Sequence, residues 1–339
     1  MIMKRVVFAG DRLFRKFPNR DFFVTRLHEV GAEAVFADGA DDAGLRELAA
    51  GAAAIVVIDR RIDRATLSAM TRPELIMTLS VGYDCVEVPA ATDLGIPVSN
   101  CPTYCIDEVA THAITLLHAV TRKLHQVLPE TLGANWGIGY AKPIHSFRGR
   151  VLGIIGLGRI GRAFARKAEA LDVQLAAYDP YVDDDIFAML GVERMVDLED
   201  LLEASDYLSI HAPLTGETRH MINAATIAKM RPHAFLVNTA RGAIIREADL
   251  LAALQDGRIA GAALDVLEVE PPAADHPLFS EPRALITPHM AWYSEESFLA
   301  NQELGMEELT RVLTGHRPQY VVNPEVLGRK NSAGRSNTA

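Results

Sequence analysis

Residues 151–161 read VLGIIGLGRIG, a short apolar run that ends in the pattern G-x-G-x-x-G. The run is typical of a buried strand. Ile160, Phe164 and Ala168 then recur every four residues, as on one face of a helix. A second apolar run, residues 173–178, ends at Asp179. Strand, glycine turn, helix, strand and acid in this order predict a dinucleotide-binding unit.

The three glycines of this pattern have different physical tasks. Gly156 lets the chain turn sharply off the strand, and Gly158 has no Cβ, so a diphosphate can approach the backbone. Gly161 lets the helix lie close to the sheet. N–H groups at the start of the helix and the positive end of its dipole would bind the diphosphate. The alternative is a glycine-rich turn in another kind of parallel sheet, which the flanking pattern and the acid disfavour.

The choice between NAD and NADP rests on Asp179, which lies 23 residues beyond Gly156. That separation suits the acid that binds the adenine ribose. A carboxylate there accepts hydrogen bonds from both ribose hydroxyls and would repel a 2′-phosphate. Residues 183–185 are all aspartate, and no lysine or arginine lies between Tyr178 and Phe187. We therefore expect NAD as the cofactor, with NADH preferred over NADPH.

The bulk properties indicate a globular protein of two domains. The chain has 339 residues, enough for two ordinary domains with a core each. Of these residues 49% are hydrophobic and 23% are charged, as in soluble globular proteins. The formal net charge is −10 and no basic run is present, so we expect no nucleic-acid partner.

The cysteines and the apolar runs bear on where the protein works. Cys85, Cys101 and Cys105 are few, odd in number and form no C-x-x-C pair, so we expect a reduced, cytoplasmic setting and no metal site. No apolar run approaches the roughly 20 residues needed to span a bilayer, so we expect no membrane association.

Strand-like and helix-like segments alternate along the chain, which predicts two doubly wound, parallel-sheet α/β domains. The first 100 residues form the smaller alternation, and a final helix is expected over 294–314. A long helix is expected over 107–125. Residues 133–150, with Trp136 among them, read as an irregular excursion that another subunit could cover. In the larger alternation we expect strands at 151–155, 174–178, 207–210, 234–238, 260–265 and 284–287, and helices at 160–171, 198–204, 223–230 and 247–256.

Three residues of this larger alternation follow the carboxyl ends of predicted strands, where ligands bind in such folds. They are Arg241, Glu270 and His289. An arginine suits the capture of a carboxylate, and a histidine oriented by an acid can exchange a proton near neutral pH. Beside a nicotinamide, the trio suits hydride transfer to a 2-keto acid. The alternatives are a surface cation, a loop acid and an ordinary histidine, since His211 also ends a predicted strand.

Several dispersed motifs resemble the D-isomer-specific 2-hydroxyacid dehydrogenase family. The resemblance runs from about Thr78 to Asn323, and the segment 291–295 after His289 is similar to the C-terminal-binding-protein branch. The matching stretches are Val81-Gly82-Tyr83-Asp84, Gly156 to Gly161, His211-Ala212-Pro213-Leu214-Thr215, Asn238 to Gly242, Ala263-Leu264-Asp265-Val266, Glu270-Pro271 and Thr287-Pro288-His289.

The resemblance implies a role for each matching residue. Arg241 would bind the substrate carboxylate and keto oxygen, His289 would be the acid and base, and Glu270 would hold His289. Backbone N–H groups of Val81 and Gly82 would bind the substrate. The implied cofactor-binding residues are Gly156, Gly158, Arg159, Ile160, Gly161, Asp179, His211, Ala212, Pro213, Thr239, Ala240, Arg241, Asp265 and His289.

Three positions bear on the substrate. Many relatives carry an arginine where Thr78 stands, so doubly charged or phosphorylated substrates are disfavoured. Tyr104 aligns with a position that faces substrate in some relatives. Trp292 could form a wall beside the substrate side chain, which would suit an apolar or aromatic 2-keto acid, or could pack between domains.

The resemblance also implies the domain plan and the activity. We expect a flavodoxin-like substrate domain at 1–101 and 290–327, a Rossmann NAD-binding domain at 102–289, an active-site cleft between them, and a disordered tail at 328–339. The expected protein is an NAD-dependent oxidoreductase for a small 2-keto or 2-hydroxy acid, dimeric through the NAD-binding domain. The alternative is an NAD(H)-sensing regulatory or scaffold dimer with little turnover.

Overall fold

The computed structural model describes residues 3–10 and 20–328. The chain divides into two compact units. The first unit comprises Met1–Tyr104 with Glu295–Ala339, and the second comprises Cys105–Ser294. That the first unit binds substrate and the second binds NAD stays a prediction. The disorder expected after residue 328 falls on residues outside the described part.

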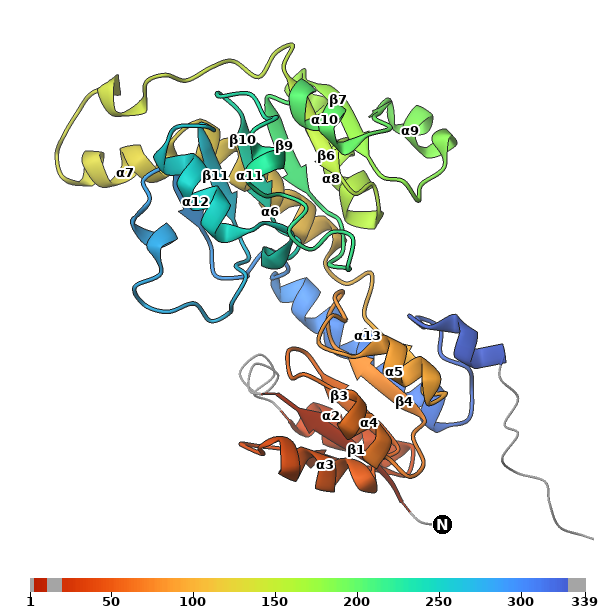
Figure 1. Cartoon of the computed structure of the whole chain (residues 1–339). Helices are drawn as coiled ribbons and strands as arrows, with labels where there is room; N and C mark the ends of the chain where they lie inside the picture. Colours follow the sequence, from red (N-terminus) through yellow and green to blue (C-terminus); the bar gives the residue numbers. More distant parts are fainter. Residues whose placement is uncertain (1–2, 11–19, 329–339) are drawn as a thin grey trace, which may run out of the picture. The chain divides into compact units, whose positions relative to one another are not determined.

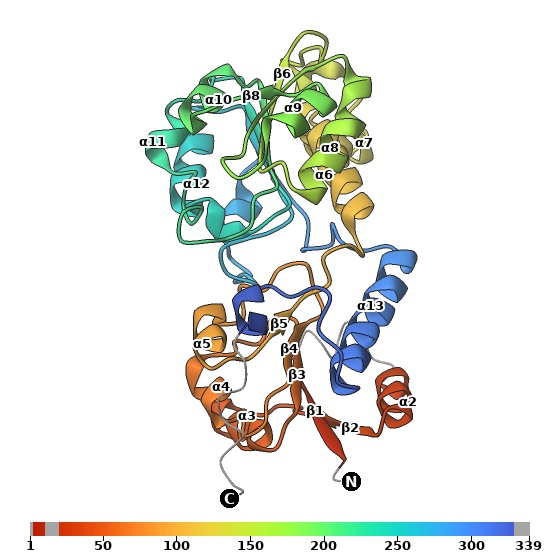
Figure 2. The ribbon, with the colours of Figure 1, turned by 90° about the vertical axis from the view of Figure 1, so that its right-hand side faces the viewer.

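The first unit is built on a five-stranded parallel sheet with the strand order β2-β1-β3-β4-β5. Helices α3, α4 and α5 cover one face, where Leu45, Leu67 and Ala90 pack against strand residues such as Ile55. Helices α2 and α13 lie on the other face (Figures 1 and 2). The bounds are β1 Lys4–Ala9, α2 Asp21–Glu29, β2 Ala32–Phe36, α3 Asp42–Ala50, β3 Ala54–Val57, α4 Arg64–Ala69, β4 Leu75–Thr78, α5 Val88–Asp93, β5 Val98–Ser99, α13 Glu295–Leu313 and η5 Pro324–Gly328.

The second unit contains a seven-stranded sheet in the order β12-β11-β10-β9-β6-β7-β8. All its strand pairs are parallel, and the chain reverses its direction of progress between β6 and β9. Such a switch point opens a crevice at the carboxyl ends of the strands. The bounds are β6 Val151–Ile155, β7 Gln174–Tyr178, β8 Glu193–Arg194, β9 Tyr207–Ile210, β10 Phe235–Asn238, β11 Gly261–Leu264 and β12 Ala284–Ile286.

Helices cover both faces of this sheet (Figure 2). Helices α6, α8 and α9 bury residues such as Leu117, Phe164 and Phe187 on one face. Helices α10, α11 and α12 bury residues such as Leu202 and Leu250 on the other. The bounds are α6 Ile106–Thr121, α7 Leu124–Leu132, η1 Ile138–Ala141, α8 Arg159–Ala168, η2 Glu169–Leu171, α9 Asp184–Leu190, α10 Leu198–Ala204, α11 Ala224–Ile227, η3 Gly242–Ile244, α12 Glu247–Gln255 and η4 Pro277–Ser280.

The two sheets confirm the predicted fold class, whereas one predicted helix is wrong. The helix expected over 107–125 ends at Thr121, and a separate helix α7 follows at Leu124–Leu132. Lys123 between them has a φ of 54°, a left-handed conformation that interrupts the helix. The sequence has no glycine or proline at this position, so the interruption of the helix could not be predicted. Within the described residues, no helix combines the length and apolar character needed to cross a membrane.

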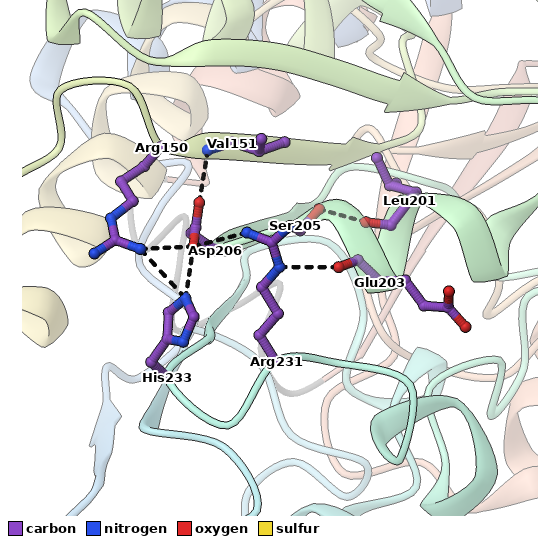
Figure 3. Close-up of polar contacts among 8 residues, drawn as sticks. All are labelled: Arg150, Val151, Leu201, Glu203, Ser205, Asp206, Arg231 and His233. Carbon is purple, nitrogen blue, oxygen red and sulfur yellow. Dashed lines mark hydrogen bonds and ion pairs between the residues drawn. The ribbon is translucent and has the colours of Figure 1, made fainter.

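A buried carboxylate joins the amino ends of the central strands of the second unit (Figure 3). Asp206, directly before β9, is 3% exposed in its side chain. Its Oδ2 accepts from the Val151 N–H at 2.8 Å, and its Oδ1 lies 2.6 Å from His233 Nε2. Arg150 and Arg231 donate to Oδ1 at 3.1 Å each. Burial alone would raise the pKa of Asp206, but the Val151 N–H, His233 and Arg231 together hold it below its ordinary value.

We predict that Asp206→Asn lowers the free energy of unfolding at pH 7 by about 2 kcal/mol, because it removes the buried charge that accepts from Val151, His233 and two half-exposed arginines. Since the folded-state pKa lies below the unfolded value of about 3.9, the contribution is present above that pH and is lost as the pH falls through the folded value. Urea unfolding from pH 7 to pH 3 measures it.

The exposed loop residue Asp275 provides the matched control, Asp275→Asn, which should leave the unfolding free energy unchanged. A wild-type stability at pH 7 in Asp206→Asn would contradict this interpretation. So would a stability difference that stays constant down to pH 3.

Candidate active site

The glycine turn after β6 is shaped by close backbone contacts. Gly156 has a φ of +90°, and a Cβ on it would lie 2.6 Å from the Ala212 backbone nitrogen. A Cβ on Gly161 would lie 2.1 Å from the Gly156 carbonyl oxygen. Neither position can hold a side chain without moving the turn. At Gly158, by contrast, an added Cβ would meet nothing within 4 Å, so this side of the turn is open to a ligand.

Asp179 sits against the same turn. One carboxylate oxygen accepts from the Leu157 N–H at 2.7 Å, and the other accepts from the Tyr181 N–H at 2.9 Å. The carboxylate is therefore fixed at the end of β7, beside the amino end of α8. The Tyr181 hydroxyl in turn donates to Glu217, which joins the loop after β7 to the loop after β9.

Two further residues near the strand ends have unusual polar environments. His211, directly after β9, is partly buried, and desolvation of its ring lowers its pKa to about 3, so the ring stays neutral. Its Nε2 lies 2.9 Å from the Ser209 hydroxyl, and its ring lies 4.6 Å from that of Phe164. The buried Thr239 hydroxyl, after β10, has no hydrogen-bond partner within the described part of the chain. An unsatisfied buried hydroxyl indicates room for a ligand.

His289 and Glu270 form a close pair beyond the neighbouring strands β12 and β11. His289 Nδ1 lies 2.6 Å from Glu270 Oε2, and the other Glu270 oxygen accepts from the Leu267 N–H at 3.0 Å. Because an ionised carboxylate can only accept, Nδ1 carries the proton of this hydrogen bond. Nε2 is then the ring nitrogen that can give or take a proton. The two side chains are 35% and 17% exposed.

Arg241 follows β10, the next strand of the sheet. Asn238 holds its loop, donating to the Arg241 carbonyl at 2.9 Å and accepting from the Ala240 N–H at 3.0 Å. A Cβ on the neighbouring Gly242 would lie 1.9 Å from the Leu267 carbonyl carbon. Only glycine therefore lets the Arg241 loop pack on the backbone of the loop that carries Glu270.

Asp265 binds the loop that carries His289. Its side chain is 1% exposed. Its two oxygens accept from the N–H groups of Met290 and Ala291 at 3.0 and 2.9 Å, and its carbonyl accepts from the His289 N–H at 2.8 Å. Trp292 Nε1 donates to the His289 carbonyl at 3.0 Å. Asp265, expected at the cofactor, thus has a structural task in this loop as well.

The remaining candidate substrate residues belong to the first unit. Val81 and Gly82 follow β4, and their carbonyls accept from Asn100 Nδ2 and the Ser80 hydroxyl at 2.6 Å each. Tyr104 is buried beyond β5. Thr78, where many relatives carry arginine, is uncharged and buried.

The sequence analysis assigned no role to two polar residues near His289. His112 of α6 lies 3.1 Å from the Thr287 hydroxyl, which donates to Asp265 at 2.5 Å. Helical periodicity placed His112 on a helix, but no sequence signal pairs it with a residue 175 positions away. Among residues 3–10 and 20–328, no group of three or more His, Cys, Asp or Glu side chains is arranged to hold a metal ion.

Comparison with known proteins relates this arrangement to one family. Residues 114–291 match the family described as D-isomer specific 2-hydroxyacid dehydrogenase, NAD binding domain. A glyoxylate reductase of Thermofilum pendens is 37% identical over 290 residues, covering 84% of each chain. A D-3-phosphoglycerate dehydrogenase of Methanocaldococcus jannaschii is 36% identical over 298 residues, which are 88% of this chain but only 56% of that relative.

A solved structure extends the similarity over both units. An NADPH-dependent glyoxylate/hydroxypyruvate reductase from Sinorhizobium meliloti, in complex with NADP and malonate, is 31% identical. The alignment covers 97% of this chain and 99% of that one, with a TM-score of 0.85.

Proposed function

We propose that this protein reduces a small 2-keto acid with NADH, reversibly. The chain belongs to the D-isomer specific 2-hydroxyacid dehydrogenase family and is an oxidoreductase that acts on CH–OH donors. The observation that carries the proposal is the 2.6 Å hydrogen bond between His289 Nδ1 and Glu270. It fixes one ring nitrogen and leaves the other for proton transfer, as a reduction of C=O to CH–OH requires.

The residues of the second unit supply the groups that this reaction needs. The nicotinamide supplies the hydride when it is bound. In reduction, His289 Nε2 gives its proton to the oxygen on substrate C2, and in oxidation it takes that proton back. Glu270 holds the ring through Nδ1 and stabilises the imidazolium. Arg241 binds the substrate carboxylate and stabilises the negative charge that develops on the keto oxygen.

The turn after β6 fits a dinucleotide. The open side of Gly158 and the N–H groups at Arg159 and Ile160 would hold the diphosphate. The fixed carboxylate of Asp179 would bind the adenine ribose. The unsatisfied Thr239 hydroxyl would face the cofactor. Family membership supports NAD or NADP, and the preference for NADH rests on Asp179 and on the acidic segment 183–185 after it.

The substrate proposal follows from the relatives and from three residues. The glyoxylate reductase relative supports a small 2-keto acid. The backbone N–H groups of Val81 and Gly82 would bind its carboxylate, and Tyr104 and Trp292 would line its side chain. The uncharged Thr78 argues against phosphorylated substrates, and this chain spans just over half of the phosphoglycerate dehydrogenase relative.

An NAD(H)-sensing regulator of the C-terminal-binding-protein kind is the alternative. Catalytic groups held as closely as His289 and Glu270 support an enzyme instead, because a scaffold gains nothing from a fixed proton donor.

We also propose a homodimer through the second unit. Helix α7 buries none of its residues, and large apolar side chains at its end and after it are exposed: Leu132 at 88%, Trp136 at 93% and Ile138 at 74%. A second copy of this chain would cover them.

The activity is tested by NADH consumption against glyoxylate, pyruvate, hydroxypyruvate, phenylpyruvate and 4-methylthio-2-oxobutyrate. We expect fast turnover of at least one acid. His289→Gln and Arg241→Gln should each lower kcat at least about 100-fold, because each loses an interaction made in the transition state. Their NADH affinity should change little.

The controls are the exposed residues His316 and Arg148, as His316→Gln and Arg148→Gln, which should keep wild-type turnover. Near-normal turnover in His289→Gln would remove this residue from the mechanism. Tight NADH binding without turnover of any acid would favour the regulatory alternative.

The coenzyme preference is tested by calorimetric titration with NADH and NADPH. Wild type should bind NADH at least about tenfold more tightly, because the Asp179 carboxylate repels a 2′-phosphate. In Asp179→Ser, the affinities for NADH and NADPH should become similar, or NADPH should bind more tightly. Tighter binding of NADPH by wild type would show that Asp179 does not set the preference.

The dimer is tested by light scattering coupled to gel filtration. Wild type should have twice the chain mass, and Leu132→Glu with Trp136→Glu should give the monomer, since two charges would be buried at the interface. Val196→Glu, at a position 78% exposed elsewhere in the second unit, should remain a dimer. A wild-type monomer would refute the proposal.

A further inference from the structure

The backbone at His289 is held in an unfavourable conformation. Its φ is 53°, in the left-handed region that side chains other than glycine rarely adopt. Such a residue persists only where the surrounding structure fixes it, and such positions gather at functional sites.

The carboxylate of Asp265 supplies the first layer of that support. It accepts from the N–H groups of the two residues after His289. The same Oδ1 that accepts from Met290 also accepts from the Thr287 hydroxyl at 2.5 Å. Asp265 therefore binds the loop on both sides of His289, and the direction of its Oδ1 decides where the imidazole lies.

The Thr287 hydroxyl is itself oriented by His112. A hydroxyl has one proton, and Thr287 donates it to Asp265, so towards His112 it can only accept. His112 Nε2 must then carry a proton and donate it at 3.1 Å. A directed chain results, from the His112 Nε2–H to the Thr287 hydroxyl to Asp265 Oδ1, which lies 3.5 Å from His112 Nε2.

Helix α6 holds the other end of the same loop. The Ser294 hydroxyl donates to Glu108 Oε1 at 2.9 Å, and Glu108 lies one helical turn before His112. Residues 287 and 294 thus both bind one side of α6, with His289 between them. The helix is anchored in turn, because Ala113, Leu116 and Leu117 are buried against the sheet.

We propose that His112 and Thr287 are positioning residues for His289, acting through Asp265 on the loop conformation without touching the substrate. This inference rests on the proposed role of His289 as proton donor. Loss of the Thr287 hydroxyl would remove one of the two hydrogen bonds that Asp265 Oδ1 accepts from this loop, and so weaken the hold on His289 against Glu270. Small displacements of a catalytic group have large effects on the rate.

The test compares Thr287→Val, which removes the hydroxyl at constant shape, with Thr287→Ser, which keeps it. Thr287→Val should lower kcat about 10- to 100-fold, with NADH affinity changed less than about threefold. Thr287→Ser should stay within about threefold of wild type. His112→Leu should behave like Thr287→Val, and His112→Gln, which retains a donor at similar reach, should recover most of the activity.

A second readout is independent of turnover. In the NMR spectrum of the wild type, the His289 Nδ1 proton in the hydrogen bond to Glu270 should give a downfield resonance, assigned by its loss in His289→Gln. Thr287→Val and His112→Leu should broaden or abolish it, and Thr287→Ser should keep it. The matched control is Thr115→Val on the same helix, where the hydroxyl binds only the Thr111 carbonyl of its own turn.

The outcomes separate the two proposals. If no 2-keto acid is reduced by wild type, the proposed function fails, and the NMR comparison still decides whether Thr287 and His112 hold His289. If kcat and the His289 resonance in Thr287→Val and His112→Leu match those of Thr115→Val, the positioning role is refuted. A loss of folding in Thr287→Val, read from its dispersion of resonances, leaves the decision to the His112→Leu and His112→Gln pair.

Discussion

The hydrogen bond between His289 Nδ1 and Glu270 is the interaction on which the proposed chemistry depends. It exists because β11 and β12 are parallel neighbours, so that the loops after them leave the sheet at one edge. The Leu267 N–H fixes the acid, and Asp265 fixes the loop of the histidine. A proton donor defined by two strand ends and a buried carboxylate is preorganised before any substrate binds, which is the condition for efficient proton transfer.

Close backbone packing also shapes the loops at the carboxyl ends of these strands. Gly242 lets the Arg241 loop lie on the backbone of the Glu270 loop, and Gly156 and Gly161 bring the turn after β6 against α8 and the loop after β9. These glycines are required for contact distance, because a Cβ at any of them would overlap main-chain atoms. At the amino ends of the strands, the buried Asp206 carboxylate accepts hydrogen bonds from the segments before β6 and β10 and so joins the strands. The proposed catalytic residues thus lie at the carboxyl ends of the strands, and the stabilising Asp206 contacts lie at the amino ends.

The sequence predicted the fold class, and the expected strands lie within a residue or two of their positions, because parallel strands buried on both faces are continuous apolar runs. The short edge strand β8, Glu193–Arg194, has no such run and was not expected. The pair His289 and Glu270 was likewise expected, from strand ends and from the family motifs. What the sequence could not predict depends on conformation or on distant contacts. Lys123 breaks a helix without a breaker residue, and the chain from His112 through Thr287 to Asp265 joins three segments that only the fold brings together.

In the proposed function, Arg241 binds the carboxylate of the keto acid and His289 supplies the proton, so that the substrate is held in a single orientation. The most direct test is the enantiomer of the product, measured by chiral chromatography after NADH-dependent reduction of hydroxypyruvate, or of whichever prochiral 2-keto acid is turned over fastest. We expect a single enantiomer, because the hydride then reaches only one face of the carbonyl, and we expect it to be the D form, as in the D-isomer specific family. A racemic product, or the L enantiomer, would contradict this expectation.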